Sequence, residues 1–457
     1  MSILKPPREQ LTRTVIKIWY FLCNPRSHSW SAKVRSMIHS RRFTFIRTTF
    51  ALILVGSLVM TTGSTQACTT AVISGKATPD GRPLLWKNRD APHRDNEVIY
   101  LAGEPYQCVA VANAGHTKAI WMGVNEAGFC IENSLSKDLT EKGAKGLGNG
   151  KFMLRALQTC ATVEDFQQLL EETNKDGRAT NANFGVIDAR GGAAIFETGA
   201  THFVKFDAND PEIAPDGYVV RSNFSFTGQN LAAPIQEDAL GDLYSSGRFQ
   251  RGCQLMELGL ESEGLTPQYL LRHCCRDLAA DGEPILGTLN SPYGELPDLV
   301  DTDSTISRAT SVSAAVFQGV QPGEDPLLST MWVLNGPPTF SVAVPCWVAS
   351  EGVAAELDGP KTSDLCTASL ALRDSQYPEG KLLRTQFLPE IWDATLGTEE
   401  AILNEANQKL AIWRREGITR QAVRETHDGQ ARRALHTLSN LTESIAEGEL
   451  APVVAAP

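Results

Sequence analysis

A cysteine stands where export would leave it at the start of the mature chain. Cys68 follows Ala67, and cleavage between them would give one residue both a thiol and a free α-amino group. The reference pKa of such an amine is about 7.7–8.0, and that of a thiol is about 8.5. The amine can therefore act as the base for its own side chain. The nearest histidines, His93 and His116, fall in no pattern that indicates a base.

The residues before Cys68 have the pattern of a targeting segment. A basic stretch at residues 41–47 precedes an apolar run from Phe50 to Met60. That run is shorter than the roughly 20 residues that cross a bilayer. Small and polar residues follow, and Thr65 and Ala67 suit a signal peptidase. We therefore expect cleavage after Ala67, an exported protein that is periplasmic or secreted, and no stable membrane anchor. An uncleaved signal anchor is the alternative.

This leader also sets the expected domain plan. Residues 1–67 are assigned to the signal peptide, with Met37 as a candidate for the true start because it gives a leader of ordinary length. Residues 68–390 are expected to form the main domain. Helical periodicity returns from Glu399 to about Glu447, which predicts a C-terminal helical extension over residues 391–457.

The charge of the mature chain excludes one class of partner. The first 67 residues hold ten Lys and Arg and one acid, so the remainder carries 32 basic and 52 acidic residues. A body with a net charge of −20 should not bind nucleic acid or an anionic membrane through bulk charge. A small-molecule substrate stays compatible with it, and a homo-oligomer is left open.

The remaining cysteines and glycines indicate neither a metal nor a nucleotide cofactor. The cysteine spacings match no zinc pattern, and His273-Cys274-Cys275 lacks a second pair of ligands. The glycine-rich stretch at residues 146–150 has Lys145 and Phe152 where a P-loop needs glycine and Ser or Thr. We expect a helix with buried thiols at the first segment and a flexible loop at the second.

Strand signals dominate the first two-thirds of the chain after the leader. Hairpins are predicted around Asn125–Gly128 and around Gly191-Gly192, and two helices at residues 151–160 and 163–173. The second helix has Thr162 and Asp165 as a cap pair. Further strands are predicted at residues 68–74, 83–86, 184–188, 193–197, 202–206, 218–223, 311–320, 331–334 and 340–348. Hairpins with helices grouped apart from them predict an α+β sandwich of antiparallel sheets covered by helices.

Several short motifs, in order, resemble a known family. Cys68-Thr69-Thr70, then Asp80-Gly81, then Lys87-Asn88-Arg89-Asp90 is similar to the start of choloylglycine hydrolases and penicillin V acylases. It also resembles the related acyl-coenzyme A:6-aminopenicillanic acid acyltransferases. The resemblance implies a cysteine N-terminal-nucleophile hydrolase with a four-layer αββα sandwich, which cuts linear carbon–nitrogen amide bonds without a cofactor.

The resemblance also implies site residues at the start of the domain. Cys68 matches the nucleophile, and Asp90 matches the aspartate that holds the terminal amine. The family's arginine falls on Lys87, while Arg89 lies one residue before the aspartate. Either cation would lower the thiol pKa, and strand alternation puts both on one face, so both remain candidates.

Three further residues are carried over from later motifs. Asn133, after the hairpin Gly123–Gly128, matches an oxyanion-hole asparagine, whereas Asn125 is better explained as a turn residue. Asn223 matches a second active-site asparagine, although Asn223-Phe224-Ser225 is also a glycosylation sequon. Arg248 matches the last active-site residue, with Arg251 as its competitor.

These matches predict amide hydrolysis through a thioester on Cys68. Acyl transfer is the same chemistry with another nucleophile in place of water. A dipeptidase of the same superfamily, which also begins Cys-Thr-Thr, is an enzyme alternative. An exported binding protein or a lipoprotein acylated on Cys68 is the non-enzyme alternative, although Thr65-Gln66-Ala67 is a poor lipobox. The motifs do not specify the acyl group.

Overall fold

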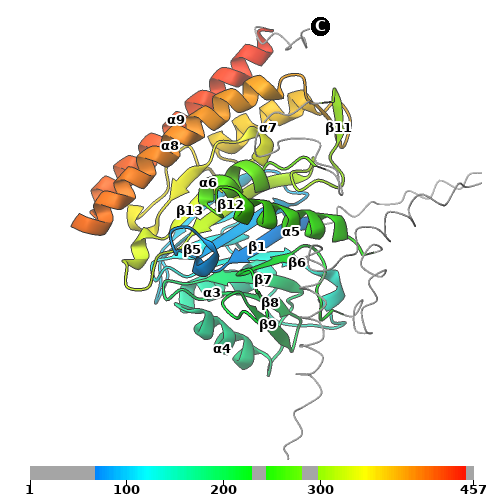
Figure 1. The fold of residues 1–457 in the computed structure, drawn as a ribbon, viewed down its shortest axis with the longest axis vertical. Helices are drawn as coiled ribbons and strands as arrows, with labels where there is room; N and C mark the ends of the chain where they lie inside the picture. The colour runs from blue at the N-terminus through cyan, green and yellow to red at the C-terminus, as the bar shows by residue number, and fades with distance from the viewer. Residues whose placement is uncertain (1–66, 229–242, 280–296, 449–457) are drawn as a thin grey trace, which may run out of the picture. The chain divides into compact units, whose positions relative to one another are not determined.

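The computed structural model describes residues 67–228, 243–279 and 297–448. The predicted leader therefore lies outside the described residues, except for Ala67. Most strands belong to two antiparallel sheets (Figure 1). The first sheet has the order β10-β1-β2-β12-β13-β14 and the second runs β3 to β9 in chain order. A short pair, β11 (Leu299–Asp301) and β15 (Leu382–Arg384), stands apart.

The strands of the first sheet are β1 (Ala67–Ile73), β2 (Leu84–Asp90), β10 (Tyr218–Arg221), β12 (Ser311–Gln318), β13 (Thr330–Leu334) and β14 (Val344–Cys346). Those of the second sheet are β3 (Asn96–Leu101), β4 (Cys108–Asn113), β5 (Met122–Asn125), β6 (Cys130–Leu135), β7 (Ala182–Ile187), β8 (Ala193–Thr198) and β9 (Phe203–Asp207). The two sheets face each other, since β1 contacts β6, β7 and β8. The second sheet is a meander, in which each strand pairs with the next one along the chain.

Helices α3 (Asn149–Thr159) and α4 (Val163–Thr173) cover the outer face of the second sheet (Figure 1). Their apolar stripes bury Phe152 and Phe166 against Phe184 and Phe196 of the sheet. The Phe166 and Phe196 rings meet edge to face, with centroids 5.2 Å apart. Thr162 and Asp165 form the predicted capping box, which satisfies the first N–H groups of α4.

The outer face of the first sheet carries the remaining helices. Helix α5 (Ser246–Glu261) packs on β1 and β10, and the short α6 (Pro267–Tyr269) and a π-helical turn (Leu270–Cys274) follow it. Helix, sheet, sheet and helix thus form four layers (Figure 1). The α+β αββα sandwich is confirmed.

Three C-terminal helices extend this last layer. They are α7 (Asp364–Gln376), α8 (Leu388–Glu416) and α9 (Arg420–Ala446), and α9 packs on both α7 and β14. The predicted boundary at residue 390 falls in the first turn of α8. A buried ion pair joins Glu399 of α8 to Arg276, with N–O distances of 2.9 and 2.7 Å. This pair ties α8 to the turn after the π-helical segment.

Hydrogen bonds of His427 attach α9 to β14 and to the segment around Ala354. Its Nδ1 lies 2.8 Å from the Pro345 carbonyl, and its Nε2 accepts the Ala354 N–H at 2.9 Å. A carbonyl only accepts and an N–H only donates, so His427 is the neutral Nδ1–H tautomer. Burial accordingly lowers the pKa of His427 to about 4. No described helix combines the length and the apolar character that a membrane span requires.

Candidate active site

The pairing of β1 with β2 places the predicted nucleophile. Cys68 lies directly opposite Arg89, and Thr70 lies directly opposite Lys87. Directly paired residues in antiparallel strands point to the same face of the sheet. Cys68, Lys87 and Arg89 therefore share the face toward the second sheet, while Asp90 occupies the opposite face. Alternation had predicted a common face for Lys87 and Arg89.

The backbone of Cys68 is held on both sides by predicted site residues. Its N–H donates to Asn223 Oδ1 at 2.8 Å, and its carbonyl accepts from Arg248 Nη1 at 2.9 Å. Arg248 Nη2 donates to the same Asn223 oxygen at 2.8 Å, which closes a triangle. Ala67 still precedes Cys68 in this structure, so the nitrogen is an amide.

The competing interpretations of these residues are less compatible with the structure. Arg251 lies one turn after Arg248 on α5 and pairs with Asp277 at 2.7 and 3.0 Å, away from Cys68. Asn223 is 5% exposed and donates from Nδ2 to the Leu135 carbonyl at 2.8 Å. A side chain enclosed in this way presents no free amide for a glycan.

The two candidate cations have different partners. Lys87 Nζ donates to Asn133 Oδ1 at 2.9 Å and to the Trp121 carbonyl at 2.8 Å. Arg89 donates to Asn96 Oδ1 at 2.5 Å and to Asn113 Oδ1 at 2.7 Å. Its guanidinium carbon lies 4.7 Å from the centre of the Trp121 ring. Of the two side chains, Lys87 is the one that donates a hydrogen bond to another predicted site residue, Asn133.

Asn133 is oriented by this lysine. An ammonium group donates and does not accept, so the atom facing Lys87 must be the amide oxygen. The Nδ2 group, which carries the two N–H bonds, then points away from Lys87. That orientation suits a donor to an oxyanion. Asn125 behaves as the predicted turn residue, since its Oδ1 accepts the N–H groups of Ala127 and Phe129.

Opposing effects act on the pKa of the Cys68 thiol. Burial raises its pKa, the Lys87 charge opposes this, and the Asp90 charge adds to it. The backbone N–H of Asp90 and the Arg89 charge lower the thiol pKa further, but burial prevails and the net pKa is raised. In the intact chain, burial thus favours the neutral thiol of Cys68.

Asp90 is positioned by two residues that the sequence did not suggest. Ser311 Oγ donates to Asp90 Oδ1 at 2.6 Å, and Arg308 Nη1 lies 3.5 Å from Oδ2. Burial raises the Asp90 pKa, while the charges of Arg248 and Arg308 oppose the rise. The predicted contact of this carboxylate with the Cys68 nitrogen is not made in the intact chain, where Asn223 accepts from that nitrogen.

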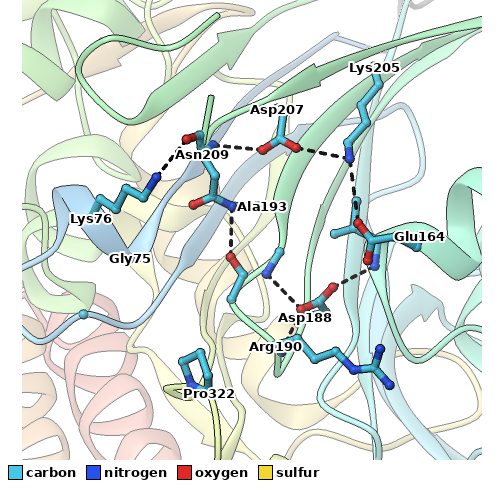
Figure 2. A pocket seen from close by; sticks show the side chains of 14 residues that line it. Gly75, Lys76, Glu164, Asp188, Arg190, Ala193, Lys205, Asp207, Asn209 and Pro322 are labelled. Carbon is cyan, nitrogen blue, oxygen red and sulfur yellow. Dashed lines mark hydrogen bonds and ion pairs between the residues drawn. The ribbon is translucent and has the colours of Figure 1, made fainter. Parts of the chain in front are cut away.

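A separate cleft of about 560 Å³ lies beyond the far end of β1, around Gly75 and Lys76 (Figure 2). Gly75 is seven residues after Cys68, which corresponds to roughly 20 Å along a strand. Lys205 in this cleft pairs with Asp207 at 3.1 Å, and Lys76 donates to the Asn209 carbonyl at 2.9 Å. Figure 2 shows Lys205 directed toward Asp207 and Glu164, and Lys76 directed toward Asn209. This cleft contains none of the predicted site residues.

The described residues hold no cluster of three or more metal-ligating side chains. The nine cysteines of the described part are free and buried.

Comparison with known families bears on these assignments. Residues 77–226 match the family described as acyl-coenzyme A:6-aminopenicillanic acid acyl-transferase. The resemblance drawn from the motifs is confirmed. The matched segment is about a third of the chain; it contains Asp90, Asn133 and Asn223, while Cys68 precedes it and Arg248 follows it. A comparison with curated proteins finds no match.

Solved structures with similarity to the chain come from three kinds of enzyme. Penicillin V acylase from Agrobacterium tumefaciens is 14% identical, with a TM-score of 0.35, over 61% of this chain and 85% of its own. A mutant of conjugated bile acid hydrolase from Clostridium perfringens is 11% identical, with a TM-score of 0.37, over 65% and 94%. A Caenorhabditis elegans ortholog of N-acylethanolamine-hydrolyzing acid amidase is 13% identical, with a TM-score of 0.35, over 57% and 93%. The fold assignment rests on the strand order and layers of this chain itself.

Proposed function

We propose that the protein is an exported hydrolase of linear amide bonds, with Cys68 as its N-terminal nucleophile. The observation that carries this proposal is the hydrogen-bonded triangle of Cys68, Asn223 and Arg248. It fixes the backbone of the one residue that cleavage after Ala67 would turn into a combined thiol and amine. The leader pattern supports export, and the family match over residues 77–226 supports acyl chemistry.

The first half of the proposed reaction forms a thioester. The free amine of Cys68 takes the thiol proton, and the thiolate attacks the carbonyl carbon of the amide substrate. The negative charge that develops on the carbonyl oxygen is stabilised by the Asn133 Nδ2 donor. The carbon–nitrogen bond then breaks, the ammonium group of Cys68 gives its proton to the leaving nitrogen, and the amine product departs.

The second half returns the enzyme to its starting state. The Cys68 amine accepts a proton from water, whose oxygen attacks the thioester carbon. The carbon–sulfur bond breaks, the carboxylic acid leaves, and the proton returns to the thiolate. Lys87 favours the thiolate through its charge, and Asn223 Oδ1, which accepts from the Cys68 nitrogen in the intact chain, is placed to accept from the free amine.

Acyl transfer is the second candidate, because the matched family is named for an acyltransferase. The thioester forms in the same way, and an acceptor amine replaces water in the second half. Supplying acceptor amines together with an N-acyl amide substrate, and measuring acylated acceptor against free acid by mass spectrometry, distinguishes the two outcomes. A predominance of free acid supports hydrolysis.

The nucleophile is tested by adding one residue in front of the mature Cys68. The thiol then remains, but the amine becomes an amide that cannot accept a proton. We expect a stably extended protein, verified by intact mass, to have no turnover. Cys68→Ser should also lose activity while it stays folded, whereas Cys160→Ser, at a buried thiol on the α3 end, should retain it.

Two results would overturn the proposal. Full turnover by the extended protein would place the base elsewhere. An exported protein in which both the thiol and the α-amine of Cys68 are permanently blocked by lipid groups would identify a lipoprotein instead. A substrate panel of free dipeptides and N-acyl amides separates the dipeptidase alternative, which predicts turnover of the dipeptides alone.

A further inference from the structure

A carboxyl group lies buried between the sheets beneath the nucleophile strand. Glu132 of β6 is fully buried and reaches toward Thr70 of β1. Gly185 of β7 leaves the space for it, because a Cβ there would lie 2.3 Å from Glu132 Oε1. The same Cβ position would lie 2.9 Å from Leu85 and 3.1 Å from Val72, so the surroundings are largely apolar. Burial of this kind favours the neutral form of an acid.

The hydrogen bonds of Thr70 indicate where a proton must be. Thr70 Oγ1 lies 2.5 Å from Glu132 Oε1 and 2.7 Å from the Trp86 carbonyl oxygen. A hydroxyl has one hydrogen, which can point well at only one of these oxygens. The Trp86 carbonyl carries no hydrogen, so the second one has to come from Glu132. The consistent arrangement is Glu132 O–H donating to Thr70, and Thr70 O–H donating to Trp86.

The second carboxyl oxygen agrees with this assignment. Glu132 Oε2 is buried and has no hydrogen-bond partner among the described residues. An ionised carboxylate would leave that oxygen with charge and no donor, at a considerable desolvation cost. A neutral carboxyl group bears a much smaller cost. Burial correspondingly raises the pKa of Glu132 to about 7, although the Lys87 charge and a backbone hydrogen bond from Gly185 oppose the rise.

The charged neighbours connect this proton to the active site. Lys87 lies directly opposite Thr70 on β2, and its burial lowers its pKa, while negative charge on Cys68 or Glu132 opposes this and favours the charged ammonium group. Arg221, opposite Thr70 on β10, is paired with Glu197 of β8 at 2.7 Å. Arg221 is therefore already neutralised. Lys87 is left as the cation whose charge either Glu132 or the Cys68 thiolate can balance.

We propose that Glu132 is a positioning residue that stores a proton beneath Lys87 and must remain neutral for Lys87 to favour the Cys68 thiolate. Loss of the proton places a second anion near Lys87, and the thiolate then competes with it for the same positive charge. The link between Glu132 and catalysis rests on the proposed function. The protonation of Glu132 itself is independent of the proposed function.

Infrared difference spectroscopy tests the proton directly. Between about pH 5 and pH 9, a carbonyl band of a protonated carboxyl group should disappear with a midpoint near neutrality. Glu132→Gln should remove this band, and Glu171→Gln, an exposed glutamate on α4, should leave it unchanged. Glu132→Asp, which draws the carboxyl away from Thr70, should shift the band. A spectrum of Glu132→Gln identical to that of the wild type would overturn the proposal.

The alkylation rate of Cys68 tests the link to the thiol. Iodoacetamide modification, located by peptide mass, should be about three- to tenfold faster in Glu132→Gln than in the wild type above neutral pH. The two rates should converge below about pH 6, where Glu132 is neutral in both. Equal rates throughout would refute the coupling. If alkylated Cys68 leaves turnover intact while the infrared band titrates as expected, the nucleophile assignment fails and the buried proton stands.

Discussion

Replacing Asn133 separates two roles that its contacts allow. Its Oδ1 accepts from Lys87 at 2.9 Å, and its Nδ2 is the proposed oxyanion donor. Asn133→Ala removes both groups. Asn133→Asp keeps an acceptor for Lys87 but replaces the N–H donor with a second oxygen. The two variants therefore differ in the lysine contact and share the loss of the donor.

The expected losses follow from where each interaction acts. A missing oxyanion donor costs about 2.7–4 kcal/mol in the transition state, which is about 10²–10³ in kcat. We expect Asn133→Ala to fall in this range with KM little changed, since the donor acts mainly in the transition state. Asn133→Asp should lose at least as much, because a carboxylate facing the oxyanion repels it. Its melting temperature should stay near that of the wild type.

Steady-state kinetics on the best amide substrate, with circular dichroism and thermal melting for the fold, provide the measurements. Asn440→Asp on α9, where the side chain is exposed, is the matched control and should retain kcat. A folded Asn133→Asp with kcat within about twofold of the wild type would show that Asn133 only anchors Lys87. The oxyanion assignment would then be wrong.

Three further outcomes follow from the described contacts. Arg248→Lys keeps the charge but cannot serve the Cys68 carbonyl and the Asn223 oxygen together, so kcat should fall about 10–100-fold in steady-state assays; unchanged kinetics would contradict this. The Glu132 pKa is raised from 4.5 to about 7, so the folded state keeps a proton that the unfolded state releases. The wild type should therefore lose about 3 kcal/mol of unfolding free energy as the pH rises between those values, and Glu132→Gln should lose less. Equal losses in the two proteins, measured by denaturation across that range, would contradict this. Glu399→Gln leaves Arg276 as an unbalanced buried charge and should cost about 3–5 kcal/mol by urea denaturation, whereas a loss below about 1 kcal/mol would show a weak pair.

Local structure was predictable where one segment carries its own signal. The hairpin at Asn125–Gly128 and the cap pair Thr162 and Asp165 are formed by residues close in sequence, and both are observed. β2 was predicted to end at Trp86 but continues to Asp90. The prediction stopped too early because the last four residues of the strand are polar and do not have a typical strand pattern. Their burial depends on partners that the segment itself does not specify. The pairing of β2 with β12 could likewise not be predicted from a local pattern, because the two strands are far apart in the sequence.

The site residues likewise divide into those that a sequence motif predicted and those that only the folded structure reveals. Cys68, Asn223 and Arg248 were each predicted from motifs, and the structure brings them into direct contact. Ser311 and Arg308, which position Asp90, were not predicted, since a serine that begins a distant strand and an arginine just before it have no distinguishing pattern. Glu132 was missed for a related reason. Its significance comes from complete burial, which only the packing of the two sheets creates.

The strand order has a consequence for how the chain reaches its native state. Asp90 meets Ser311 across 221 positions of sequence, and Cys68 meets Arg248 across 180. Contacts between such distant residues carry a loop-closure cost and form slowly. The meander β3 to β9 pairs strands that follow one another along the chain and can form earlier. We therefore expect the Cys68 thiol to acquire its surroundings late in folding, since chains that end before β12 leave β2 without one of its two neighbouring strands.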